Sequence, residues 1–215
     1  ELPQVTMVYF FISRPPHKWE IFMGEDKDEN DLLIRYGFPE DIWFHVHDLS
    51  SAHVYIRMAP GKGIADIPEE VLEDCMQLVK HNSIQGDKAQ SVTVVYTPWT
   101  NLNKTASMDV GQVGFHEESL ALKKTITKNA AIFKALEKTR VQKVVDLAGQ
   151  KEAREKADRM AEKKAKERAR LEERENREAK QRAEDALHYK GVLTESKMKS
   201  NKTNKTAKQM EEEFM

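Results

Sequence analysis

Six side chains that could contact a nucleobase fall on one face of a predicted hairpin. The segment Ile42–His47 alternates apolar and polar residues, and His53–Met58 alternates again after a short connection. Successive side chains of a strand point to opposite faces, so every second residue lies on the same side. The residues on this side are Trp43, His45, His47, His53, Tyr55 and Arg57. Aromatic rings with histidine and arginine on one sheet face are typical of a platform on which unpaired bases stack.

A second interpretation of this face is structural. Trp43 and Tyr55 would then pack beneath neighbouring helices, and the histidines His45 and His53 would form internal hydrogen bonds. His47 and Arg57 are the members that we expect to be exposed. The sequence leaves the two interpretations open for the buried members.

The same histidines have ligand types that suit a metal, but their spacing does not favour a metal site. His45, His47 and His53 with Asp48 could bind zinc, yet the sequence has no cysteine pair and no His-Glu-x-x-His motif. It also has no P-loop, no Gly-x-Gly-x-x-Gly motif and no recognisable pair of catalytic carboxylates. We therefore expect no metal, no cofactor and no enzymatic activity.

The second candidate site is a row of basic side chains on a long predicted helix. From about Val144 to Tyr189 the chain has one glycine, no proline and many Ala, Glu, Lys and Arg residues, as one continuous helix would. At about 100° per residue, seven basic residues fall within a sector of roughly 80° and form a ridge about 30 Å long. They are Lys156, Arg159, Lys163, Lys166, Arg170, Arg174 and Arg177. Such a basic ridge could follow the phosphates of a nucleic acid.

Other roles for this helix remain open. Pairs such as Glu152–Lys156 and Glu162–Lys166 have the i,i+4 order that stabilises an isolated helix, so the helix could be a spacer or could bind a protein partner. Alanines recur every four residues from Ala153 to Ala169, and this stripe winds around the helix instead of forming a heptad seam. We therefore expect a monomer.

The near-neutral net charge of −1 hides two halves of opposite sign. Through Lys128 there are 12 Lys and Arg against 19 Asp and Glu, a balance of −7. The remainder has 23 against 17, a balance of +6. This asymmetry favours a polyanionic partner for the second half of the chain.

Apolar periodicity predicts an α+β domain followed by the charged helix. Hairpins are expected over 8–23 and 42–58, further strands over 92–96, 110–115 and 122–126, and helices over 28–36, 68–82 and 129–138. Hairpins of this kind give a largely antiparallel sheet. The predicted parts are a compact head over 7–140, the helix over 144–190, and a disordered Lys-rich tail with an acidic end over 191–215.

The single cysteine, Cys75, lies in a helical apolar pattern, so no intrachain disulfide can form and a reducing compartment fits. No apolar run approaches the ~18 residues of a membrane helix. We expect a cytoplasmic protein without a transmembrane segment.

Residues 41–57 read Asp-Ile-Trp-Phe-His-Val-His-Asp-Leu-Ser-Ser-Ala-His-Val-Tyr-Ile-Arg. This segment resembles the signature of the NFACT-R domain, which is named for RNA binding and occurs in ribosome-quality-control factors. The resemblance continues through 67–83, 92–97 and 110–115 and covers about residues 7–190. The charged helix and the Glu-Phe-Met end are similar to the small eukaryotic coiled-coil-domain-containing members of the family.

The resemblance implies association with nucleic acid or with ribosomes. Where the family has a strongly basic loop, this chain has residues 101–108 with Lys104 as the base, and the resemblance implies a nucleic-acid contact there. The function expected is a non-enzymatic adaptor that binds RNA or ribosomes through the ridge and the hairpin face. The alternatives are a protein-interaction scaffold that uses the long helix and the acidic C-terminus, and a DNA-binding sensor.

Overall fold

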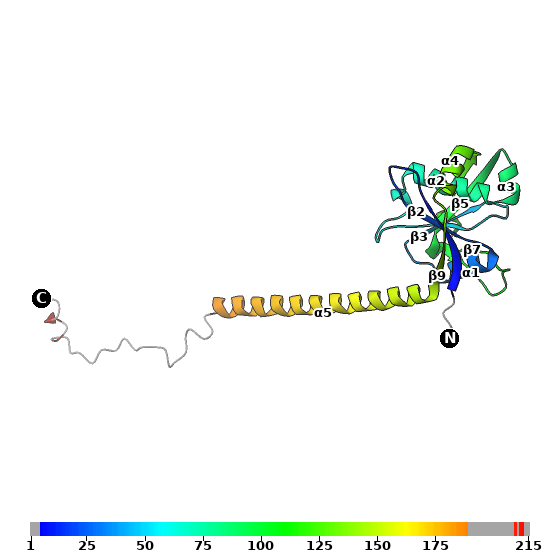
Figure 1. Cartoon of the computed structure of the whole chain (residues 1–215). Helices are drawn as coiled ribbons and strands as arrows, with labels where there is room; N and C mark the ends of the chain where they lie inside the picture. The colour runs from blue at the N-terminus through cyan, green and yellow to red at the C-terminus, as the bar shows by residue number, and fades with distance from the viewer. Residues whose placement is uncertain (1–4, 189–208, 210, 213–215) are drawn as a thin grey trace. The chain divides into compact units, whose positions relative to one another are not determined.

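The structure, a computed structural model, describes residues 5–188, 209, 211 and 212 (Figure 1). The chain divides into two compact units, the first ending at Lys156 and the second beginning at Ala157. The first unit contains all the strands that the structure describes and is called the head below.

Helices are interspersed among the strands of the head, and α5 follows the last strand. The strands are β1 (Val5–Ile12), β2 (Glu20–Gly24), β3 (Asp41–Val46), β4 (Val54–Arg57), β5 (Ser91–Pro98), β6 (Leu102–Asn103), β7 (Gly114–Phe115), β8 (Leu122–Thr127) and β9 (Val141–Asp146). The helices are α1 (Lys27–Tyr36), α2 (Glu69–His81), α3 (Ile84–Lys88), α4 (Ala130–Glu137) and α5 (Leu147–Leu187), with 3₁₀ turns η1 (Ile64–Asp66), η2 (Trp99–Asn101) and η3 (Glu118–Leu120).

Seven strands form one sheet in the order β8-β5-β3-β4-β2-β1-β9. Every pairing in it is antiparallel, and both predicted hairpins, β1–β2 and β3–β4, are present. The α+β class with a largely antiparallel sheet is therefore confirmed. The weaker strand predicted over 110–115 is reduced to β7, which pairs with β6 in a separate two-stranded sheet.

Each face of the large sheet is covered by different elements (Figure 1). Helices α2 and α4 pack on the face that carries Phe44, Val54 and Ile56, which are fully buried. On the opposite face a second cluster joins Trp43 and Tyr55 to residues of α1, β6 and the start of α5. The alternation along β3 and β4 therefore separates two cores.

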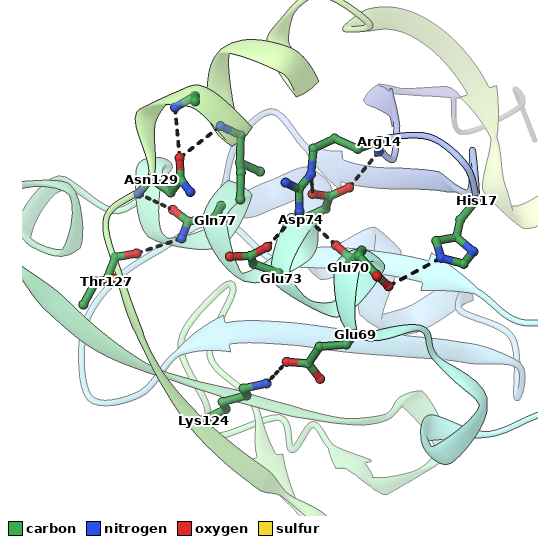
Figure 2. A network of polar contacts seen from close by, with 12 residues as sticks. Arg14, His17, Glu69, Glu70, Glu73, Asp74, Gln77, Lys124, Thr127 and Asn129 are labelled. Carbon is green, nitrogen blue, oxygen red and sulfur yellow. Dashed lines mark hydrogen bonds and ion pairs between the residues drawn. The ribbon is translucent and has the colours of Figure 1, made fainter.

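A network of polar contacts joins α2 to neighbouring segments of the head (Figure 2). The buried carboxylate of Asp74 accepts hydrogen bonds from the backbone N–H of Arg14, at 2.8 Å, and from the Arg14 guanidinium, which also pairs with Glu73 at 2.8 Å. Gln77 donates to the carbonyl of Thr127 and accepts from the backbone N–H of Asn129, at 2.7 and 3.0 Å. These contacts tie α2 to the end of β1 and to the connection between β8 and α4.

The predicted boundary at residue 140 precedes β9, which the structure places at the sheet edge. Six residues of β9 pair with β1, and the first turns of α5 belong to the same compact unit. Helix α5 begins at Leu147, where the carboxylate of Asp146 accepts the Gly149 backbone N–H at 2.8 Å. The long helix is thus confirmed with a later start, because residues 141–146 pair as a strand.

The tail predicted over 191–215 lies outside the described residues, apart from 209, 211 and 212. None of the helices described is both long enough and apolar enough to cross a membrane.

Candidate nucleic-acid interface

The hairpin face exists in the register that alternation predicts. Trp43 of β3 lies directly opposite Tyr55 of β4, and Phe44 lies opposite Val54 on the other face. Trp43 stacks on His45 with ring centroids 5.4 Å apart, and its indole N–H donates to Nδ1 of His53 at 3.0 Å. The structure therefore brings the histidines and aromatic rings together.

Most of this face is covered by protein. Trp43, His53 and Tyr55 are only 1–3% exposed, and Phe115 of β7 packs edge-on against the Trp43 ring at 5.8 Å. Stacking of a base on Trp43 or Tyr55 would require the overlying elements to move. The structural interpretation of these three side chains therefore has direct support in the geometry.

Burial also keeps the two inner histidines neutral. Burial lowers the pKa of His45, and burial together with the neighbouring His45 and Lys104 lowers the pKa of His53 to about 3. Since Nδ1 of His53 accepts the hydrogen bond from Trp43, its proton lies on Nε2. Neither ring offers a positive charge to a phosphate near neutral pH.

His53 should make the head lose stability in mild acid. A histidine whose pKa is lower in the folded state binds its proton mainly in the unfolded state, so stability falls as the pH drops below about 6.5. From pH 7 to pH 5 the loss attributable to His53 should be about 2 kcal/mol. Urea unfolding at both pH values measures it. His53→Asn keeps an acceptor for Trp43 and should show a smaller loss; an equal loss in both proteins would contradict this assignment.

His47 and Arg57 lie nearer the solvent, as predicted. His47 has Nε2 at 3.2 Å from Asp48 and at 3.1 Å from the ammonium of Lys123. The guanidinium of Arg57 forms two hydrogen bonds to the buried carboxylate of Asp41, at 2.7 and 3.0 Å, and lies 4.0 Å from the Phe38 ring centroid. Arg57 is therefore fixed in place, with one side facing outward.

Lys104 is engaged within the head. Its ammonium contacts the carboxylate of Asp31 at 2.8 Å and the carbonyls of Asp109 and Gln112 at 2.7 and 3.0 Å. These three acceptors match the three N–H donors of an ammonium group. Lys104 therefore holds the loop before β7 against α1, and a phosphate would have to compete with these partners.

An aromatic row on the hairpin face extends beyond the predicted residues. Phe10 of β1 pairs with Phe22 of β2, and Phe22 pairs with Tyr55, with ring centroids 6.0 and 5.3 Å apart. The row is buried at Trp43 and partly exposed at Phe10, where it borders a groove of about 780 Å³. Sequence reasoning did not select Phe10 or Phe22, although the alternation of β1 and a hairpin register would have placed both on this face.

The basic ridge is displayed on α5 as predicted. All seven of its side chains are exposed, and α5 is helical throughout the range that they occupy. Lys166 pairs with Glu162 at 2.6 Å and Arg174 with Glu178 at 3.6 Å. Helical geometry places every acidic residue of α5 between Lys156 and Arg177 outside the 80° sector of the ridge. A nucleic-acid backbone that approaches this sector meets basic side chains first.

In the described ranges, 5–188, 209, 211 and 212, no three His, Cys, Asp or Glu side chains are grouped so that they could hold a metal ion.

Comparison with protein families assigns residues 7–117 to the family described as NFACT protein RNA binding domain. The match covers just over half of the chain. The chain belongs to this family. Membership supports a nucleic-acid-binding role, and the NFACT-R region contains the hairpin face and Lys104 but ends before α5.

Relatives of the NFACT-R chain include coiled-coil domain-containing protein 25 of Danio rerio, which is 54% identical over 71% of this chain and 75% of the relative. The Bos taurus protein of the same name is 46% identical over 91% of this chain and 95% of the relative. Protein JLP2 of Saccharomyces cerevisiae is 43% identical over 63% of this chain and 69% of the relative. These similarities confirm the resemblance to the small eukaryotic members.

A solved structure shares the fold at lower identity. The C-terminal part of the fibronectin/fibrinogen-binding protein from Streptococcus suis matches with a TM-score of 0.50 and 21% identity, over 59% of this chain and 47% of that chain. This likeness concerns the fold alone.

Proposed function

We propose that this chain is a non-enzymatic, cytoplasmic adaptor that binds RNA, and that it does so on ribosomes. The observation that carries the proposal is the exposed basic ridge of α5 in a chain whose head belongs to an RNA-binding-domain family. The ridge supplies the phosphate contacts that give affinity, and the head supplies contacts that favour particular bases.

The charge distribution supports this division of roles. The chain through Lys128 has a balance of −7, so long-range attraction to a polyanion has to arise in the later part. Phosphates are also present in DNA, and the ridge alone would suit either nucleic acid. We propose RNA because the family description names RNA.

Ribosome association can be tested by a sucrose-gradient profile of the native protein, with and without RNase. The proposal predicts cosedimentation with ribosomes or their subunits, and movement of the protein to lighter fractions when RNase or high salt disrupts the RNA contacts. A protein that stays at the top of every gradient would contradict the ribosomal part of the proposal. Cosedimentation that resists both RNase and salt would favour a protein-interaction scaffold.

A further inference from the structure

The groove beside Phe10 has the parts of a base-binding site, and Phe10 and Phe22 within it were not among the site residues predicted from the sequence. It measures about 780 Å³, within the range of small-molecule sites, and it lies entirely within the head. Strands β1, β2 and β9, the end of β4 and the first turn of α5 all contribute side chains to it.

The floor of the groove is aromatic and rigid. Phe10 and Phe22 lie next to each other on paired strands, and Phe22 stacks on the fully buried Tyr55 with an interplanar angle of 11°. Rings held by sheet pairing have little freedom to lose when a ligand stacks on them. Base–aromatic stacking is worth roughly 1–3 kcal/mol for each base.

Both cations and carboxylates line the groove. The ammonium of Lys143 lies 4.3 Å from the Phe10 ring centroid, and the guanidinium of Arg57 lies 5.5 Å from that of Phe22. Lys143 is half exposed and pairs with Glu20 at 3.3 Å, while Asp146 also lines the groove. Because Lys143 has a flexible stem, a flat ligand can displace it from the ring and leave the Glu20 carboxylate as an acceptor.

From this geometry we propose that the groove binds one unpaired base of a single-stranded RNA, an inference that rests on the proposed function. The rim is close to neutral, with two cations and two carboxylates, so it suits a polar aromatic ring better than a phosphate. Carboxylates only accept hydrogen bonds, so they favour a base with an exocyclic amino group, and the purines adenine and guanine combine that donor with a larger stacking area. The groove therefore prefers an amino-bearing purine, for which adenine serves as the probe, while the ridge binds phosphates of any sequence.

The test compares a hexa-adenylate RNA with an abasic oligomer of the same length, which keeps the phosphates and lacks the bases. Fluorescence anisotropy with the full chain should give about 10-fold tighter binding of the hexa-adenylate. Phe10→Leu removes the ring and should reduce this preference to nearly 1, with little change in binding of the abasic oligomer. Ala59→Leu narrows the groove from its exposed rim and should reduce the preference several-fold even if Phe10→Leu fails to fold.

The matched control is Tyr9→Leu, which removes a neighbouring ring that faces the opposite side of the sheet and should keep the preference. Equal binding of the two oligomers by the wild-type chain, or a preference that survives both groove variants, would overturn the inference and leave the groove to a ligand such as an apolar peptide. In either case, binding of both oligomers would still support the proposed function. If the chain binds neither oligomer, the result contradicts the groove inference and the proposed function alike.

Discussion

Reversing the charge of three basic residues in the ridge should weaken binding of single-stranded RNA at least about 100-fold at roughly 0.1 M salt. The variant carries Lys163→Glu, Lys166→Glu and Arg170→Glu, which replace three adjacent phosphate contacts with three repulsive charges. All three side chains are exposed on α5, so the head should remain folded. Anisotropy titrations measure the affinity, and circular dichroism verifies that the helix is retained.

The matched control reverses the charge of three basic residues outside the ridge. Lys164, Arg168 and Arg182 lie about 120–160° around the helix from the centre of the ridge, and their replacement by Glu changes the net charge by the same amount. This control should lose less than about 10-fold in affinity, because only long-range attraction is weakened. Equal losses in the two variants would show that net charge, and not the geometry of the ridge, determines binding.

Replacing Arg14 by Met should destabilise the head by about 3–5 kcal/mol, a large fraction of a typical stability. The Asp74 carboxylate has no exposed side-chain area, and burial raises its pKa even with Arg14 beside it. Without the guanidinium, Asp74 would be left as a buried charge with the Arg14 backbone N–H as its remaining donor (Figure 2). Urea unfolding at pH 7 measures the loss.

Two further variants separate this cause from a general loss of packing. Asp74→Asn added to Arg14→Met removes the buried charge, keeps an acceptor for the backbone N–H, and should recover most of the stability. Lys124→Met removes another cation of the same network, but its partner Glu69 is largely exposed, so it should cost at most about 1 kcal/mol (Figure 2). A similar cost for Arg14→Met and Lys124→Met would contradict the buried-charge argument.

Local periodicity predicted the elements of the head because each depends on neighbouring residues. The alternation of Trp43 with Phe44 assigned their side chains to opposite faces, and pairing with Tyr55 and Val54 followed from the hairpin. Local pattern does not reveal which face another segment covers. Phe115, more than 70 residues along the chain, packs on Trp43, and the sequence offered no signal for that contact.

The edge strand β9 illustrates a second limit. Its residues alternate only weakly and Val141 and Val144 are exposed, so no strand was predicted there and the helix was expected to begin at about Val144. Pairing with β1 then determines both the true start of α5 and the position of Lys143 beside Phe10. The groove was therefore outside the reach of sequence reasoning, whereas the ridge of α5, which depends on helical spacing alone, was predicted residue by residue.

The salt dependence of RNA binding by the wild-type chain tests the central claim most directly. If the ridge contacts the phosphates, the logarithm of the association constant should fall linearly with the logarithm of salt concentration. For single-stranded RNA each phosphate contact adds about −0.7 to the slope, so five to seven contacts give a slope of about −3.5 to −5. A slope near zero, with affinity unchanged between low and high salt, would contradict a phosphate-binding ridge.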